Sequence, residues 1–96
     1  MTTTIVLKIS ATPGQGAALV AAFDEILPET RNYAGCLGVT VHREVADPDN
    51  LLLIEHWDTL EHYTSYNKWR MESGTLGGVM SVATGLPETS AYSDTD

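Results

Sequence analysis

A run of four aliphatic residues, Leu51–Ile54, most strongly limits how this chain of 96 residues can fold. Successive side chains of a strand point to opposite faces, so the run places two aliphatic side chains on each face. Such a strand needs apolar cover on both faces. A chain of this length supports one domain, here spanning 1–96, and buries only a modest fraction of its surface. One face of this strand therefore needs a cover that a single layer of helices does not supply.

The apolar pattern along the chain predicts a mixed α+β domain. Alternation with a period of two marks strands, and spacings of three and four mark helices. The expected order is a strand over 3–11, a helix over 17–32, strands over 35–45 and 51–58, helices over 59–71 and 76–84, and a strand over 86–93. This β-α-β-β-α-(α)-β order is that of the ferredoxin-like arrangement, with the helices on one side of a four-stranded antiparallel sheet. The acidic end, 93–96, is expected to be loose.

Local signals predict where the helices begin and end. Thr12 is expected to cap the first helix with Gln15 completing a capping box, and Pro28 is expected to kink this helix or end it early. Asp58, followed three residues later by Glu61, is expected to cap the second helix. Each of these helices is thus predicted to begin with a cap from its own segment.

The sheet face opposite the helices is expected to pack on a second copy of the chain. Left in water, the outer pair of aliphatic side chains in 51–54 would form an apolar patch, and such patches usually mark an interface. Two copies packed sheet to sheet around a two-fold axis would bury it. The alternative is that the C-terminal tail of the same chain covers this face. We expect the homodimer.

The turn Asp47-Pro48-Asp49-Asn50 predicts a hairpin and the register of its two strands. A two-residue or four-residue loop pairs His42 with Glu55 and Thr40 with Trp57, with directly opposed side chains about 5 Å apart. The face expected under the helices then holds Thr40, His42, Glu44, Leu53, Glu55 and Trp57. The face expected in the dimer holds Leu37, Val39, Val41, Leu52, Ile54 and His56. A one-residue bulge would exchange the two faces.

In this register, His42 and Glu55 would form an acid/base pair. A carboxylate next to an imidazole favours the charged form of the ring and orients it. Covered by helices and mixed with aromatic and aliphatic side chains, the pair suits a pocket with a few polar groups. The alternative is a solvated cross-strand ion pair of little energetic value. The sequence pattern is compatible with both interpretations.

The charge of the chain argues against nucleic acid and against a membrane as partners. Thirteen Asp and Glu against five Lys and Arg give a net charge of −8, and the basic residues are scattered. A polyanion or an anionic membrane surface would be repelled. The first ten residues have neither the cationic start of a signal peptide nor the length of a membrane span. The single cysteine, Cys36, fits a reducing cytoplasm, which is the expected location.

No metal or cofactor is expected. The three histidines, His42, His56 and His62, do not share a face at ligand spacing, so no metal site is predicted. No phosphate-binding loop and no serine nucleophile motif appears. The helical stripe of His62, Tyr66 and Trp69 is typical of a packed helix face.

A family resemblance lies in the segment Leu52–Tyr66, which reads LLIEHWDTLEHYTSY. With the upstream ETRNYAGCLGVTVHRE and the DPDN turn, this segment resembles the antibiotic biosynthesis monooxygenase family, over roughly residues 3–84. The resemblance implies a dimeric ferredoxin-like barrel with a pocket between helices and sheet. It also implies a class of enzymes that oxygenates polycyclic phenols or quinols without metal or flavin.

The resemblance carries over at some positions only. Trp57 and Tyr63 match a tryptophan and a tyrosine that line the pocket in the family's polyketide oxygenases. Leu53 stands where an asparagine is expected and Gly77 near where an arginine is expected, which weakens the case for a polyketide substrate. The haem-degrading branch is not matched, because its asparagine, tryptophan and ligand histidine correspond here to Leu7, Tyr66 and a position near Leu76.

The function expected from these observations is a cofactor-independent monooxygenase that oxidises a small phenol, hydroquinone or polycyclic polyketide-like substrate with O2. His42 is expected to act as the base, oriented by Glu55, while Trp57 and Tyr63 position the aromatic ring. The other expected substrate-binding residues are Leu7, Phe23, Thr40, Leu53, His62, Tyr66 and Met80. The alternative is a non-catalytic ligand-binding or stress-related dimer that uses the same pocket.

Overall fold

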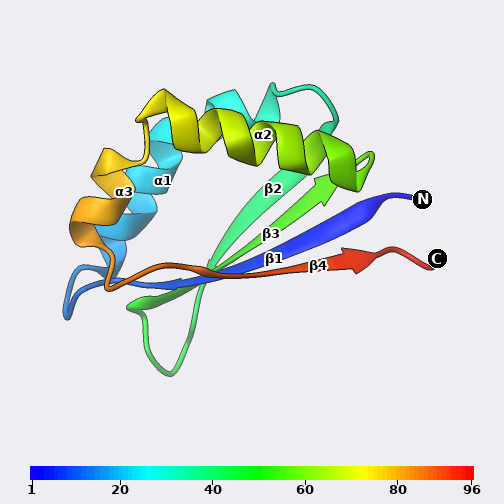
Figure 1. Cartoon of the computed structure of the whole chain (residues 1–96). Coiled ribbons are helices and arrows are strands. Elements are labelled where there is room, and N and C mark those ends of the chain that lie inside the picture. Colours follow the sequence, from blue (N-terminus) through cyan, green and yellow to red (C-terminus); the bar gives the residue numbers. More distant parts are fainter.

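The computed structural model describes residues 1–96 and contains four strands and three helices in the expected order. Their bounds are β1 Thr3–Ser10, α1 Gly16–Arg31, β2 Cys36–Arg43, β3 Asn50–Trp57, α2 Leu60–Ser73, α3 Gly77–Val82 and β4 Glu88–Ser93. The strands form one antiparallel sheet in the order β2-β3-β1-β4. All three helices lie on one side of this sheet (Figure 1). The predicted ferredoxin-like α+β fold is therefore confirmed.

Alternation along β3 separates a covered sheet face from an open one. Leu51 and Leu53 are buried under the helices, whereas Leu52 and Ile54 point to the other side and are only half-buried. The buried apolar residues of α1 recur at spacings of four and pack on the covered face; they are Leu19, Phe23 and Leu27. Full burial of one such side chain contributes about 1.5–3 kcal/mol. The core therefore lies between helices and sheet, and β3 is apolar on both faces, as predicted.

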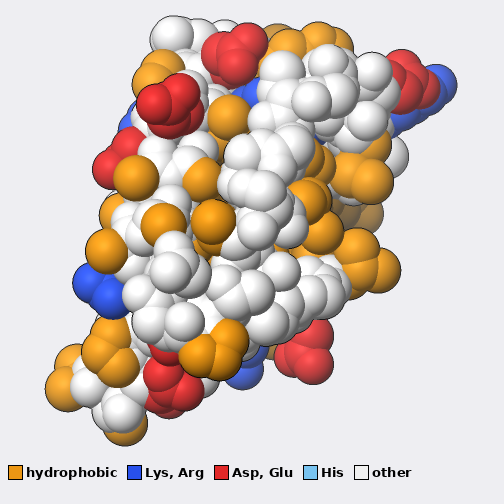
Figure 2. Space-filling model, turned by 90° about the vertical axis from the view of Figure 1, so that its left-hand side faces the viewer, with side chains coloured by type: hydrophobic (Ala, Val, Ile, Leu, Met, Phe, Trp, Pro, Cys, Tyr) orange, Lys and Arg blue, Asp and Glu red, His pale blue; other side chains and the backbone are white.

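The surface of the molecule carries no large basic patch on the face that Figure 2 presents, which is the end with α3. Hydrophobic and polar atoms are mixed over this face, and the Lys and Arg side chains in view are separated from one another. Among the helices, none has the length and apolar character that crossing a bilayer requires. The scattered basic residues of the sequence thus stay scattered on this part of the fold.

The N-terminus of α1 is capped from the β2–β3 loop and not by the predicted capping box. The Asp49 carboxylate accepts the backbone N–H groups of Gly14 and Gly16, both at 2.9 Å. Gln15 occupies the N-cap position but makes no side-chain capping bond, and the Thr12 hydroxyl donates elsewhere. The free N–H groups of a helix start need an acceptor, whichever part of the chain supplies it. This contact ties the hairpin loop to α1.

The other predicted helix ends shift as well. The hydroxyl of Thr59 caps α2 by accepting the N–H of His62 at 3.1 Å, so the cap lies one residue later than the predicted Asp58. The helix α1 continues through Pro28 to Arg31 and does not end early. Because Pro28 lies in the last turn, only a small part of the helical hydrogen-bond pattern is affected by its missing N–H.

The register between β2 and β3 is the main departure from the sequence prediction. His42 pairs with Leu52, and Glu55 pairs with Val39, so the pairing is displaced by three residues from the predicted His42–Glu55 pair. Displacement by an odd number of residues moves every side chain of a strand to the other face. Val39 therefore lies buried under the helices, and Thr40 and His42 lie exposed on the open face.

The loop between β2 and β3 sets this register, and an irregularity interrupts the pairing at the far end of β2. Six residues, 44–49, separate the two strands, rather than the two or four of the prediction. The loop closes with the Asn50 N–H donating to the Asp47 carbonyl at 3.0 Å. At the other end of β2 the pairing is interrupted between Cys36 and Gly38. A bulge is expected to exchange the two faces of the sheet. The interruption at this end is of that kind, but the longer loop exchanges the faces by itself.

Candidate active site

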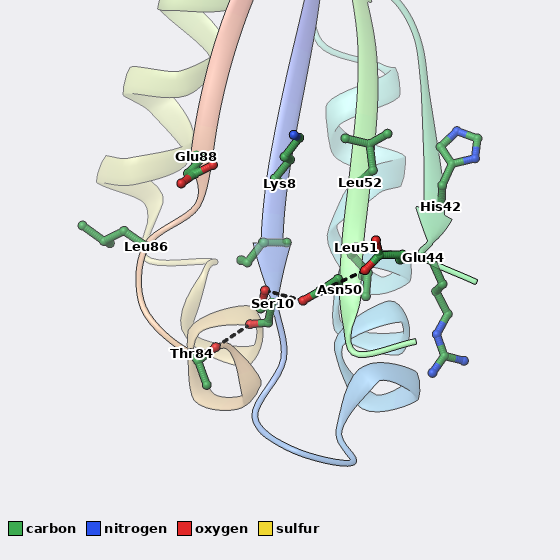
Figure 3. Close-up of a pocket in the computed structure, with 12 residues that line it drawn as sticks. Lys8, Ser10, His42, Glu44, Asn50, Leu51, Leu52, Thr84, Leu86 and Glu88 are labelled. Atoms are coloured by element: carbon green, nitrogen blue, oxygen red, sulfur yellow. Dashed lines mark hydrogen bonds between the residues drawn. The ribbon is translucent and has the colours of Figure 1, made fainter. Parts of the chain in front are cut away.

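Two surface hollows of more than 500 Å³ each lie outside the helix-covered core. The first, of about 530 Å³, lies on the open sheet face, where Lys8, Leu52 and His42 stand side by side on β1, β3 and β2 (Figure 3). In this hollow the Asn50 side-chain amide donates to the Glu44 carboxylate at 2.9 Å, so these two polar groups satisfy each other. The second, of about 540 Å³, lies between α1 and β2. All titratable side chains that line the two hollows are exposed, so neither hollow contains a buried acid or base.

Five aromatic rings pack between α2 and the sheet at the end of β3. We call them the aromatic cluster, and its members are Tyr33, Trp57, Tyr63, Tyr66 and Trp69. Neighbouring ring centroids lie 5.0 to 6.4 Å apart in tilted or edge-to-face arrangements, which are the favourable ones for aromatic pairs. Trp57 is fully buried, whereas Tyr33, Tyr63 and Trp69 are half-buried. The cluster therefore reaches from the core to the surface.

The carboxyl group of Glu55 is buried against the aromatic cluster. Glu55 precedes Trp57 by two residues on β3, so both side chains point toward the helices, and only 4% of Glu55 is exposed. The indole N–H of Trp57 donates to Oε1 of Glu55 at 3.0 Å. Burial raises the pKa of Glu55 above its usual value, while the Trp57 hydrogen bond and the charge of Arg70 oppose this shift. A buried carboxylate whose pKa is raised binds a proton more readily than an exposed one, which suits it to act as a base.

Tyr63 and Cys36, which both pack on this site, stay protonated at neutral pH. Burial and the neighbouring Glu55 carboxylate raise the pKa of Tyr63 to about 12. Burial likewise raises the pKa of the Cys36 thiol. The Tyr63 ring centroid lies 5.9 Å from that of Trp57. The hydroxyl of Tyr63 therefore keeps its proton and can donate a hydrogen bond, and Glu55 is the group of this site that can accept a proton.

A buried arginine, Arg70, borders the cluster at Tyr66. Only 2% of Arg70 is exposed, and its guanidinium carbon lies 4.7 Å from the ring centroid of Trp69 and 5.4 Å from that of Tyr66. Its Nε donates to the Tyr66 hydroxyl at 3.1 Å. Burial raises the pKa of Tyr66, although its hydrogen bonds with Thr30 and Arg70 and the charge of Arg70 oppose this rise. The cluster is thus bounded by a carboxyl group at Trp57 and by a guanidinium group at Tyr66.

The structure brings together four of the residues that the sequence predicts for the site. Glu55, Trp57, Tyr63 and Tyr66 all belong to the aromatic cluster or border it. Three more predicted residues lie in the adjacent apolar core under the helices rather than in the cluster, and these are Leu7, Phe23 and Leu53.

The remaining predicted residues lie elsewhere. Thr40 and His42 are exposed on the open sheet face, where the His42 ring bonds the Thr40 hydroxyl at 2.9 Å. His62 belongs to the cap of α2, and Met80 is exposed on α3. The predicted pair of His42 with Glu55 does not form, because the observed register places them on opposite faces. No group of three or more His, Cys, Asp or Glu side chains is placed to hold a metal ion.

Three residues of the site, Tyr33, Trp69 and Arg70, are absent from the predicted site residues, although Trp69 is predicted to lie on a packed helix face. Trp69 and Arg70 follow Tyr66 by three and four residues on α2, and this spacing places them on the same helix face. An arginine on the same helix face as aromatic residues is therefore a sequence signal that identifies Arg70 as a candidate site residue. Tyr33 lies in the connection between α1 and β2, where no periodicity identifies its direction.

Comparisons with known proteins concern both family and fold. The profile of the family described as antibiotic biosynthesis monooxygenase matches residues 2–70. A Bordetella bronchiseptica structure assigned to this group is 19% identical with a TM-score of 0.87, and the match covers 98% of this chain and 97% of that chain. A Deinococcus radiodurans structure, also assigned to it, is 23% identical with a TM-score of 0.81, covering 100% and 94%.

A third solved structure is that of SnoaB, a cofactor-independent oxygenase from Streptomyces nogalater. It is 14% identical with a TM-score of 0.83, and the match covers 99% of this chain and 94% of that chain. At identities this low, the structural matches establish the shared fold alone. Among curated proteins, no sequence matches significantly. The profile match, which spans more than half of the chain, is the finding that bears on family.

Proposed function

Because the chain belongs to the antibiotic biosynthesis monooxygenase family, we propose that it is a cofactor-independent monooxygenase acting on an electron-rich phenol or hydroquinone. The observation that carries the proposal is the buried Glu55 carboxyl, which is hydrogen-bonded to Trp57 at the edge of the aromatic cluster. Aromatic side chains bind an aromatic substrate by stacked and edge-to-face contacts, and the carboxylate supplies a base. The description of SnoaB as a cofactor-independent oxygenase supports this choice of reaction.

In the proposed reaction, the Glu55 carboxylate removes the hydroxyl proton of a phenol whose carbon para to that hydroxyl carries a hydrogen, as in 1-naphthol. The resulting phenolate is electron-rich enough to reduce O2, which adds to the ring carbon para to the phenolate oxygen. Cleavage of the O–O bond, with loss of the hydrogen on that carbon, gives a quinone and water. One oxygen atom enters the quinone and the other leaves as water, which also takes the proton held by Glu55. The substrate supplies all the electrons.

The residues around Glu55 would assist this reaction in separate ways. Tyr63 is a protonated donor beside the carboxylate, and its hydroxyl can hold the phenolate oxygen. Trp57 orients Glu55 through the indole N–H. The buried cluster excludes water, which strengthens these interactions. Glu55 thus takes the role of base that the sequence analysis assigned to His42, which lies on the other sheet face.

Oxygen uptake with a panel of phenols and hydroquinones, 1-naphthol among them, tests the proposal. We expect equal amounts of O2 consumed and quinone formed in metal-free buffer with EDTA, and label from oxygen-18 gas in the quinone. His42→Ala is expected to retain most of the turnover, because His42 lies on the open face. A requirement for added metal or flavin contradicts the proposal. Absence of turnover with measurable binding of 1-naphthol favours a ligand-binding protein without catalysis.

We also propose that the open sheet face packs on a second copy of the chain. The helices lie on the opposite side (Figure 1), and Leu52 and Ile54 remain half-buried on the open face. Tyr92 lies on the same face of β4, with β1 between it and β3, and is 56% exposed. The alternative cover, the C-terminal tail, does not cross this face, because β4 pairs with β1 at the sheet edge. A two-fold sheet-to-sheet dimer buries these side chains.

Sedimentation at micromolar concentration tests the dimer. The unaltered chain is expected to sediment at twice its mass of 10.4 kDa. Ile54→Lys places a charge in the centre of the proposed interface and is expected to give a folded monomer. A folded monomer of the unaltered chain at this concentration contradicts the proposal.

A further inference from the structure

The guanidinium of Arg70 is saturated with hydrogen bonds inside the fold. An arginine side chain carries five N–H donors. Here five bonds are made, to the Tyr66 hydroxyl at 3.1 Å, the Thr75 hydroxyl at 2.8 Å, the Glu29 carboxylate at 3.4 Å, the Ile26 carbonyl at 2.9 Å and the Thr30 hydroxyl at 2.9 Å. No donor is left for a ligand. Arg70 therefore acts on its own protein and not directly on a substrate.

These bonds connect α2 to α1 at Tyr66. Ile26 and Thr30 lie one turn apart on α1, and Tyr66 and Arg70 lie one turn apart on α2. The Thr30 and Tyr66 hydroxyl oxygens are also 2.7 Å from each other. Thr30, Tyr66 and Arg70 therefore form a closed triangle of hydrogen bonds, and the hydroxyl of Tyr66 is held from both helices.

The charge of Arg70 has little compensation from carboxylates. The one carboxylate in direct contact with it, that of Glu29, has a side chain that is 54% exposed, so solvent screens the interaction. The buried Glu55 carboxyl interacts with the same charge without a hydrogen bond to it. The guanidinium instead lies over the rings of Trp69 and Tyr66, which attract a cation through their faces. A buried charge is costly unless it is fully hydrogen-bonded, and an apolar residue could fill the same volume. Two of the five bonds go to the Tyr66 hydroxyl and to Thr30, which itself bonds that hydroxyl. The bonds to the α1 residues Ile26 and Glu29 fix the guanidinium itself, which points to a role in placing Tyr66.

We propose that Arg70 is a positioning residue of the active site, which holds Tyr66 and through it the walls of the aromatic cluster. The inference rests on the proposed oxygenase function. The ring of Tyr66 lies 5.0 Å from that of Trp57, centroid to centroid, and Trp57 holds Glu55 through its N–H. Because the Tyr66 ring packs against the Trp57 ring, a fixed Tyr66 also keeps Trp57 in place. Trp57 then keeps its N–H directed at Glu55. When Tyr66 is released, the base and the substrate ring lose their mutual alignment.

Arg70→Lys and Thr30→Val test this role, with two matched controls. Lysine keeps the positive charge but lacks the planar fork that makes five bonds, and valine keeps the shape of Thr30 without its hydroxyl. Both variants are expected to lower kcat, for Arg70→Lys by about a hundred-fold, with a much smaller change in KM. Thr30→Ser keeps the hydroxyl and is expected to restore most of kcat. Lys68→Ala removes an exposed charge from the same helix and is expected to have no effect.

The outcomes separate this inference from the proposed function. Unchanged kcat in folded Arg70→Lys and Thr30→Val overturns the positioning role; if Arg70→Lys fails to fold, Thr30→Val decides alone. If the unaltered protein oxidises no phenol, the proposed function fails, and positioning is then judged without turnover. In that case a changed near-ultraviolet circular dichroism of the rings, with weaker 1-naphthol binding and an intact far-ultraviolet spectrum, supports the role. Unchanged near-ultraviolet signal and affinity overturn it.

Discussion

Glu55→Gln is expected to lower kcat by about 10²- to 10⁴-fold, the usual contribution of a general base. Glutamine keeps the size of the side chain, and its oxygen can still accept the indole N–H of Trp57, but it cannot take up a proton. Steady-state oxygen uptake with 1-naphthol measures the effect. Glu72→Gln removes an exposed carboxylate from α2 and serves as the matched control, with kcat unchanged. Equal kcat in Glu55→Gln and in the unaltered chain would exclude Glu55 as the base.

The pH dependence of activity and that of stability are expected to run in opposite directions, and both follow from Glu55. Because burial raises the pKa of Glu55, the base is protonated at low pH, and kcat/KM rises as pH rises through this pKa. The folded state holds this proton more tightly than the unfolded state. The free energy of unfolding therefore falls as pH rises from the ordinary glutamate pKa through the raised pKa of the folded state. Glu55→Gln removes this loss, so the variant is expected to be the more stable protein above that pH window.

Thermal unfolding of both proteins over a series of pH values measures this difference. The expected result is a variant that is inactive and yet more stable at high pH. If Glu55→Gln is less stable than the unaltered chain at every pH, burial of the Glu55 carboxyl does not destabilise its charged form. The two signatures together distinguish the loss of a base from a general loss of structure, since damage to the fold would lower activity and stability together.

Trp57→Ala is expected to lower the free energy of unfolding by about 3–5 kcal/mol. Trp57 is fully buried and packs against three tyrosine rings, so truncation removes contacts and leaves a cavity that the sheet and α2 cannot easily fill. Urea unfolding followed by far-ultraviolet circular dichroism gives the value. A loss below about 1 kcal/mol, typical of an exposed position, contradicts the central place of Trp57 in the cluster.

Trp57→Phe is the informative companion, because it keeps a ring and loses only the indole N–H and part of the volume. The hydrogen bond from Trp57 lowers the pKa of Glu55, so its removal is expected to raise that pKa further. The rise of kcat/KM with pH then moves to higher pH. A pH profile with an unmoved midpoint shows that the Trp57–Glu55 bond does not influence the base.

The sequence by itself determined the architecture and the residues that share the site on β3 and α2. Period-two alternation identified β1, the aliphatic run Leu51–Ile54 identified β3, and spacings of three and four identified α1 and α2, with bounds close to those observed. The same periods place Glu55 with Trp57, and Tyr63 with Tyr66, on common faces. These relations involve residues only a few positions apart, and the local backbone geometry of a strand or helix is enough to establish them.

Only the tertiary structure decided the β2–β3 register, the cap of α1 and the network of Arg70. Because 51–54 is apolar on both faces, burial alone accepts either register, and the loop bonds around Asp47 select the one that separates His42 from Glu55. Arg70 and Thr30 are 40 residues apart in the sequence, and Asp49 and Gly16 are 33 apart. Local periodicity does not relate residues at such separations. The physical reason is that periodicity determines which way neighbouring side chains point. Hydrogen bonds between distant segments determine which of those side chains meet.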